Sequence, residues 1–269
     1  MERVWKRVRR GLRVLVGSCV VAGSALILTP DVSVAADAVK QVSPKTVKVS
    51  EQAAMERVIR DYLLKNPEVI RDAMMALEFR ERQTKEQLAS AALRANAEKL
   101  LRDPSSPVGG NPKGDVTVVE FFDYHCGYCR KVSPDMEALV ASDPNVRVVY
   151  KEFPILGPES VSAARAALAA NKQGRYVAFH KALMAAETFN DASLDKIAAD
   201  LGMNLERFKA DRADPKLSAV LDANYALASA LDINGTPAFV IGQKLIPGAA
   251  GLEGLKAAVN AARQALTKK

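Results

Sequence analysis

Apolar positions recur every three to four residues between residues 51 and 102, a spacing that predicts helices. Asn66-Pro67 interrupts this pattern, and Pro67 suits the first turn of a second helix. The stretch 78–87 is heavily charged and breaks the heptad repeat, so the pattern does not define an oligomeric state. The apolar face of the first predicted helix, 51–65, consists of Met55, Val58, Ile59, Tyr62 and Leu63.

About fifty helical residues bury too little apolar surface to be stable alone. The apolar face of residues 51–102 must therefore pack either on the main domain or on another copy of itself. We favour self-association and expect this region to build a homo-oligomer.

Later in the chain, strand and helix patterns alternate. Residues 103–114 are rich in Pro, Gly and Ser and predict a linker. Four strands are then predicted at 116–122, 146–153, 238–242 and 244–246. Helices are predicted from the Cys pair to about Val140, through the Ala-rich block 159–232, and at 251–267. Without the Ala-rich block, this order is that of a thioredoxin-like fold. We expect an α/β, thioredoxin-like domain at 115–269 with a helical insertion at about 157–232, preceded by the all-helical region.

The start of the chain has the pattern of a leader. Six basic residues within 1–13 precede the apolar run 14–28, and small residues follow at Ser33, Ala35 and Ala36. This order predicts a secretory signal peptide at 1–35, and hence an exported protein. An uncleaved membrane anchor is the alternative, but the apolar run is short for a full span. Residues 36–50 show no clear period and are interpreted as a linker.

Removing the predicted leader changes the charge and the cysteine count. Residues 1–35 hold six basic and two acidic side chains, so the net charge falls from +7 to +3. That charge is too small to indicate nucleic-acid binding, and no basic cluster with interleaved aromatic residues is present. Cys19 is removed with the leader, which leaves Cys126 and Cys129.

Cys126 and Cys129 are separated by two residues, between a predicted strand and a predicted helix. Such a short loop stabilises a fold little, so this pair indicates a redox couple rather than a structural disulfide. Because a helix N-terminus stabilises negative charge, Cys126 is expected to be the attacking thiolate. Cys129, one turn further in, is expected to resolve the mixed disulfide.

Metal binding competes with the redox interpretation. Cys126, Cys129 and His125 are candidate ligands for copper or zinc. A structural zinc site usually takes four protein ligands, and the only other histidine is His180. We therefore expect neither a metal nor a cofactor. A third alternative is a redox-inactive scaffold presented by the helical region.

Three further positions are candidates for the site. A cis Thr236-Pro237 bond would place the Thr236 backbone beside the cysteines, whereas a trans proline opening the next strand is the alternative. Glu120, inside an apolar strand, would have a raised pKa if it points inward, and it could then shuttle a proton. Lys151 is a possible partner of Glu120. As a cation, His125 would stabilise the thiolate.

Two segments carry a resemblance to a known family. FFDYHCGYCRK, followed far downstream by GTPAFVIG, resembles the DsbA-type thioredoxin-fold proteins of the bacterial periplasm, over about residues 115–269. YLLKNPEVIRDAMMALEFR, at 62–80, resembles the N-terminal helical region of the ScsC branch, which is linked to copper tolerance and makes oligomers in some members. The resemblance implies that Cys126 is the nucleophile, Cys129 its partner, Pro237 the cis proline and Glu120 the buried acid.

The residues between the cysteines depart from the strong oxidase of this family. Gly127-Tyr128 replaces Pro-His and, together with Thr236, resembles the disulfide isomerases. The resemblance therefore implies isomerase or reductase activity on exported proteins with thiols or disulfides, together with a membrane redox partner. A periplasmic copper-binding protein using Cys126, Cys129 and His125 is the alternative function.

Overall fold

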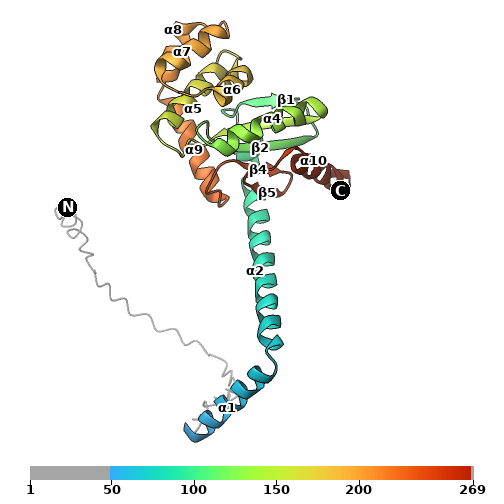
Figure 1. Cartoon of the computed structure of the whole chain (residues 1–269). Helices are drawn as coiled ribbons and strands as arrows, with labels where there is room; N and C mark the ends of the chain where they lie inside the picture. Colours follow the sequence, from blue (N-terminus) through green and yellow to red (C-terminus); the bar gives the residue numbers. More distant parts are fainter. Residues whose placement is uncertain (1–48, 268–269) are drawn as a thin grey trace, which may run out of the picture. The chain divides into compact units, whose positions relative to one another are not determined.

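The computed structural model describes residues 49–267 (Figure 1). Three features predicted from the sequence lie outside this range: the signal peptide at 1–35, Cys19, and residues 36–48 of the linker at 36–50. Within it, no helix is both long enough and apolar enough to cross a membrane.

The chain divides into two compact units at Tyr62–Leu63, inside helix α1 (Val49–Lys65). The prediction of a helix here is confirmed, and α1 contains no buried residue. Its apolar residues Met55, Val58 and Ile59 are exposed in the single chain. The apolar face that the sequence predicts therefore exists and is uncovered.

The second unit begins with α2 (Glu68–Ala95) and α3 (Ala97–Leu101). The predicted single helix ends at Asn96, whose side-chain amide donates to the Ala92 carbonyl at 2.9 Å. Near this break the helices join the core of the unit, because Leu93 and Leu100 are buried. Most of α2 before Leu93 is exposed.

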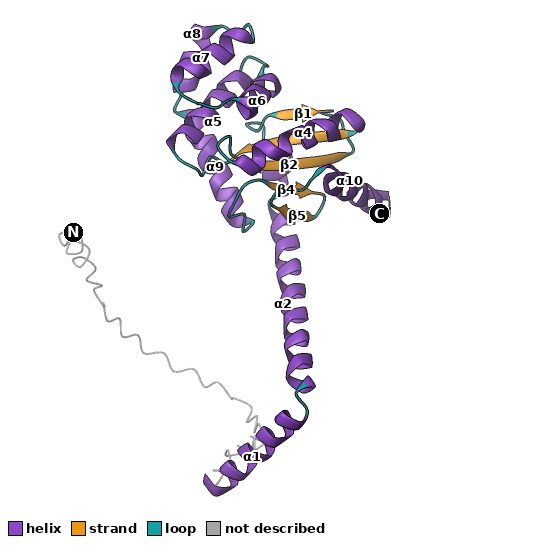
Figure 2. Cartoon of the chain, in the orientation of Figure 1, coloured by secondary structure: helices purple, strands orange, loops and turns teal. Residues whose placement is uncertain are grey.

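Within residues 49–267 the strands form one five-stranded sheet of order β1-β3-β2-β4-β5 (Figure 2). Strands β2 and β3 are parallel, and the other neighbouring pairs are antiparallel. The strands are β1 (Val108–Gly110), β2 (Val116–Phe122), β3 (Val146–Glu152), β4 (Ala238–Ile241) and β5 (Lys244–Pro247).

Strand β1 corrects the interpretation of residues 103–114 as a linker. Val108 pairs with Val149 at the sheet edge. At Gly110, with φ +63°, an added Cβ would lie 2.5 Å from the Val146 carbonyl oxygen, so glycine is required for this approach. The glycines that suggested a linker instead let a short strand fit against β3.

Helices cover both faces of the sheet. One core cluster joins α4 (Gly127–Ser142) and α10 (Leu252–Thr267) to Val118, Phe122 and Val148. The other cluster places Leu93 and Leu100 against the opposite face, together with Leu227 of α9 (Lys216–Ala230). The redox motif follows the C-terminal end of β2, and both of its cysteines belong to the first cluster.

The predicted helical insertion between β3 and β4 comprises α5 to α9. Besides α9, it contains α5 (Pro158–Asn171), α6 (Tyr176–Ala185), α7 (Asp191–Asp200) and α8 (Leu205–Ala213). Asn190 and Asn204 cap α7 and α8 by accepting from backbone N–H groups three residues later. The predicted fold class, thioredoxin-like with a helical insertion after a helical region, is confirmed.

Candidate active site

Cys126 occupies the N-cap position of α4, directly after the loop that follows β2. Its backbone N–H donates to the Asp123 carbonyl and its own carbonyl accepts from Arg130, both at 3.0 Å. The Cys126 side chain is 7% exposed, so an approaching sulfur atom has only a narrow access. The helix N-terminus favours negative charge on the sulfur at this position.

Cys129 lies one turn further into α4 and is fully buried. Both cysteines are free thiols, and the Cys129 thiol hydrogen-bonds to the side chain of Cys126. Burial raises the pKa of Cys129 far above its usual value, and the charges of Cys126 and Glu120 add to this effect. Cys129 therefore keeps its proton until a base removes it.

The loop before β4 completes the surroundings of Cys126. The Thr236-Pro237 peptide bond is cis, as the resemblance implies. The Cys126 thiol donates to the Thr236 carbonyl oxygen at 3.2 Å, across 110 positions of sequence. The structure thus brings Cys126, Cys129 and Thr236 together, although they come from two distant segments.

Glu120 lies inside the protein on β2, as the inward interpretation requires, with 2% of its surface exposed. Burial raises its pKa from 4.5 to about 8. The suggestion that Lys151 is its partner is wrong, because Lys151 pairs in register with Phe121 and points to the opposite face of the sheet. There the Lys151 ammonium lies 2.9 Å from Asp103 Oδ2 and 2.6 Å from Ser106 Oγ.

The remaining candidates surround the cysteines on the surface. His125 Nε2 lies 3.1 Å from Glu159 Oε2 of α5, and its ring packs edge-on against Phe189. Tyr128 is 68% exposed, and a Cβ added at Gly127 would meet no atom within 4 Å. His125 is therefore held by the helical insertion, whereas Gly127 and Tyr128 form an open surface beside Cys126.

Sequence reasoning missed Asp123, which holds the loop before Cys126. Its Oδ1 accepts from the His125 N–H and from Ser160 Oγ, both at 2.7 Å, and its Oδ2 accepts from the Leu156 N–H at 2.9 Å. Asp123 is 1% exposed, and these donors satisfy the buried carboxylate. An acidic residue between a buried strand and a Cys pair was the available signal.

A buried polar cluster behind the loop was also missed. Glu152 Oε1 accepts from the hydroxyls of Tyr124 at 3.0 Å and Tyr176 at 2.7 Å. The Tyr124 hydroxyl also lies 3.1 Å from His180 Nδ1. Burial raises the pKa of Glu152 to about 8 and lowers that of His180 to about 3. Burial thus disfavours charge on both groups, and the hydrogen bonds tie Tyr124, two residues before Cys126, to α6.

Cys126, Cys129 and His125 were also candidate metal ligands. Among residues 49–267, no group of three or more His, Cys, Asp or Glu side chains is arranged to hold a metal ion. The Nε2 atom of His125 is engaged by Glu159.

Two family models match the chain. Residues 117–260 match the DSBA-like thioredoxin domain, and residues 51–83 match the copper resistance protein ScsC N-terminal domain.

Solved structures agree with these matches. A thioredoxin-like oxidoreductase from Silicibacter pomeroyi DSS-3 is 48% identical and covers 62% of this chain and 97% of its own, with a TM-score of 0.60. A linker-deletion variant of Proteus mirabilis ScsC is 28% identical and covers 84% and 100%, with a TM-score of 0.62. A periplasmic thioredoxin-like protein from Salmonella enterica serovar Typhimurium is 33% identical and covers 62% and 94%, with a TM-score of 0.56.

Curated relatives match over only part of their length. The first is a Na(+)/H(+) antiporter NhaA 3 from Salinispora tropica, 32% identical over 58% of this chain. The chain spans about a quarter of the length of these antiporter relatives. The family model, by contrast, covers more than half of the chain, and together with the ScsC match it confirms the resemblance drawn from the motifs. The chain therefore belongs to the family of DSBA-like thioredoxin domains.

Proposed function

We propose that this protein is a periplasmic thiol–disulfide oxidoreductase that exchanges disulfides in exported proteins, with Cys126 as nucleophile and Cys129 as resolving thiol. One observation carries the proposal: Cys126 Sγ lies at the N-terminus of α4, 3.2 Å from the Thr236 carbonyl, while Cys129 is buried behind it. The oxidoreductase among the similar structures and the periplasmic relative support the activity and the compartment.

The exchange begins when the Cys126 thiolate attacks one sulfur of a substrate disulfide. The substrate S–S bond breaks, a bond forms between Cys126 and the attacked sulfur, and the other substrate sulfur leaves as a thiolate. In isomerisation, a substrate thiolate then attacks the mixed disulfide and releases Cys126 unchanged. In reduction, Cys129 attacks Cys126 Sγ, which yields the Cys126–Cys129 disulfide and a second substrate thiolate.

Cys129 must lose its proton before it attacks, and burial opposes that loss. Glu120 in its carboxylate form is the proposed proton acceptor, because its charge acts on Cys129 and burial places its pKa at about 8. The Glu120 carboxyl and the Cys129 thiol are both buried. Resolution by Cys129 should therefore slow as the pH falls below about 8, which favours isomerisation over reduction.

A test of the two cysteine roles uses single substitutions in the full mature chain. Cys126→Ser should abolish refolding of scrambled ribonuclease and yield no mixed disulfide. Cys129→Ser should still react and should accumulate mixed disulfides, because no internal thiol resolves them. Ser142→Ala, at the far end of α4, is the matched control and should behave as the wild type. Retained exchange activity in Cys126→Ser would refute the proposal.

The proposed homo-oligomer through residues 51–102 is tested on α1, where no residue is buried and a substitution leaves the catalytic unit intact. Ile59→Asp should lower the mass measured by light scattering and reduce ribonuclease isomerisation, since both rely on the uncovered apolar face. Reduction of insulin, which needs one site, should continue. Glu56→Gln on the same helix is the control. A monomeric Ile59→Asp protein with full isomerase activity would exclude a role for the oligomer.

The name of the matched N-terminal model, a copper resistance protein domain, favours copper binding as a second candidate. The three candidate ligands would be Cys126, Cys129 and His125. Glu159 engages His125 Nε2, so Cu(I) should bind through the two thiols alone. His125→Gln should then leave the affinity for Cu(I) unchanged, as measured by competition with a chromogenic chelator. A large loss of affinity in both His125→Gln and Cys126→Ser would instead establish the three-ligand site.

A further inference from the structure

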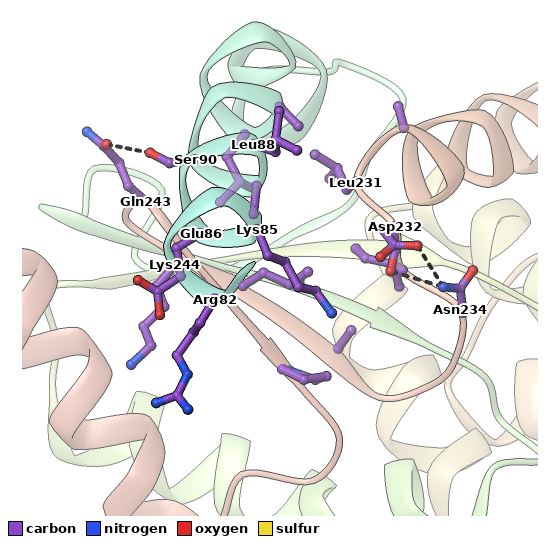
Figure 3. Close-up of a pocket in the computed structure, with 18 of the residues that line it drawn as sticks. Arg82, Lys85, Glu86, Leu88, Ser90, Leu231, Asp232, Asn234, Gln243 and Lys244 are labelled. Carbon is purple, nitrogen blue, oxygen red and sulfur yellow. Dashed lines mark hydrogen bonds between the residues drawn. The ribbon is translucent and has the colours of Figure 1, made fainter. Parts of the chain in front are cut away.

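A wide groove runs between α2, the end of α9, the loop before Pro237 and strand β5 (Figure 3). Its volume of about 1650 Å³ exceeds that of typical small-molecule sites, which is roughly 300–1,000 Å³. The wall formed by α2 is fixed to the sheet, because Arg94 Nη1 lies 3.3 Å from Gln243 Oε1 and Leu93 is buried. The size of the groove therefore fits a polypeptide segment better than a metabolite.

The groove and the thiol site share Thr236. Thr236 and Pro237 line the groove, and the Thr236 carbonyl oxygen accepts from the Cys126 thiol. When a substrate sulfur atom is bonded to Cys126, the polypeptide chain next to that sulfur must extend away from the thiol site. The groove begins at Thr236, the residue that Cys126 contacts, and offers a path for this chain.

Apolar side chains are available along the groove. Leu88 is 66% exposed and Leu77 is half-exposed, although both line it from α2. In Figure 3 the Leu88 side chain extends from α2 toward Leu231, at the end of α9, which is buried. An exposed leucine beside a buried one forms a partial apolar seat that another apolar side chain would complete.

The remaining lining suits an extended main chain of varied sequence. Strand β5 pairs with β4 and is the edge strand of the sheet, a position at which extended peptides add to sheets in other proteins. Arg82, Lys85 and Lys244 share the groove with Glu86 and Asp232, so neither sign of charge dominates (Figure 3). Selectivity must then come from the apolar seat.

We propose that this groove binds the polypeptide next to the reacting cysteine of an unfolded substrate, in extended form, with an apolar side chain seated on Leu88 and Leu231. The inference rests on the proposed function and extends it to the substrate. In this arrangement α2 forms one wall of the substrate site as well as joining the catalytic unit to α1.

The experiment compares three thiols as reductants of the oxidised full-length protein. They are glutathione, a short peptide whose cysteine is flanked by leucines, and the same peptide with serine flanks. The ratio of the leucine-peptide rate to the glutathione rate should fall about tenfold in Leu88→Ser, because an apolar contact is lost. Met75→Ser, an exposed apolar position of α2 outside the groove, is the matched control and should keep the wild-type ratio.

The outcomes separate the groove from the thiol chemistry. An unchanged ratio in Leu88→Ser, or equal rates with leucine and serine flanks in the wild type, overturns the groove proposal while thiol exchange stands. Failure of Cys126 to react with either thiol overturns the proposed function itself. A fall in mass of Leu88→Ser by light scattering, with the peptide preference intact, identifies a second copy as the occupant and overturns the proposal.

Discussion

Replacing Glu120 by glutamine should stabilise the protein at neutral pH, by an amount that increases with pH. Glu120 is buried in β2, and burial raises its pKa from 4.5 to about 8. An unfolded chain releases this proton at a lower pH than the folded chain does, so the folded state loses stability as the pH rises. The contribution of protonated Glu120 to the unfolding free energy is fully present below pH 4.5 and is lost as the pH rises toward 8.

The size of the effect follows from the two pKa values. The full difference corresponds to a penalty of about 5 kcal/mol above pH 8, and of about 3 kcal/mol at pH 7. Glutamine has nearly the same shape and cannot ionise, so Glu120→Gln removes this penalty. Its buried amide needs hydrogen bonds much as the protonated acid does, so the two proteins should be equally stable near pH 4.5.

The assay is urea unfolding of the reduced wild type and the reduced variant, from pH 5 to pH 8. The difference in unfolding free energy should grow steadily across this range. Glu152, whose pKa is also about 8, titrates in both proteins, and its pKa falls in the variant because the charge of Glu120 helps to raise it. This shift adds to the gain of Glu120→Gln at high pH. The exposed Glu187, replaced by glutamine, is the control and should show a difference near zero throughout. A difference for Glu120→Gln that is the same at pH 5 and pH 8 would refute the reasoning.

Three further substitutions test the supports of the site. Asp123→Ala removes the acceptor of three hydrogen bonds and should lower the unfolding free energy by about 3 kcal/mol. It should also slow alkylation of Cys126, and an unchanged alkylation rate would exclude a positioning role for Asp123. Lys151→Met should raise the pKa of Asp103 from about 2 toward its usual value in an NMR titration, and no change would show that the ammonium does not hold this carboxylate. Gly110→Ala should cost about 2 kcal/mol in thermal unfolding, because its φ is positive and a Cβ would meet the Val146 carbonyl; wild-type stability would contradict this.

The sequence predicted the parts of the site that lie close together in the chain or carry a family motif. Cys126 and Cys129 follow a strand and open a helix, so their positions at the N-cap and one turn into α4 follow from local structure alone. Thr236 was expected beside them because of the resemblance, since 110 positions separate it from Cys126. Strand β1 was missed because a three-residue edge strand containing two glycines has no readable hydrophobic period.

The other failures concern side-chain direction and long-range packing. Lys151 was linked to Glu120 because both are charged residues in neighbouring apolar strands, but the pairing register places them on opposite faces. The contacts of Glu152 with Tyr124 and Tyr176 depend on how α6 packs on the sheet. No local pattern reports that packing, so the cluster was visible only in three dimensions.

The cluster at Glu152 has a consequence for transplanting this redox motif. Two of its four members, Tyr176 and His180, come from α6, and the Glu152 backbone carbonyl accepts from Asn224 of α9. A chimera that grafts the segment from Asp123 to Cys129 onto a bare thioredoxin scaffold would leave the Tyr124 hydroxyl without its buried partners. The insertion and the motif therefore form one structural unit, and a working graft must carry α6 and α9 along with the cysteines.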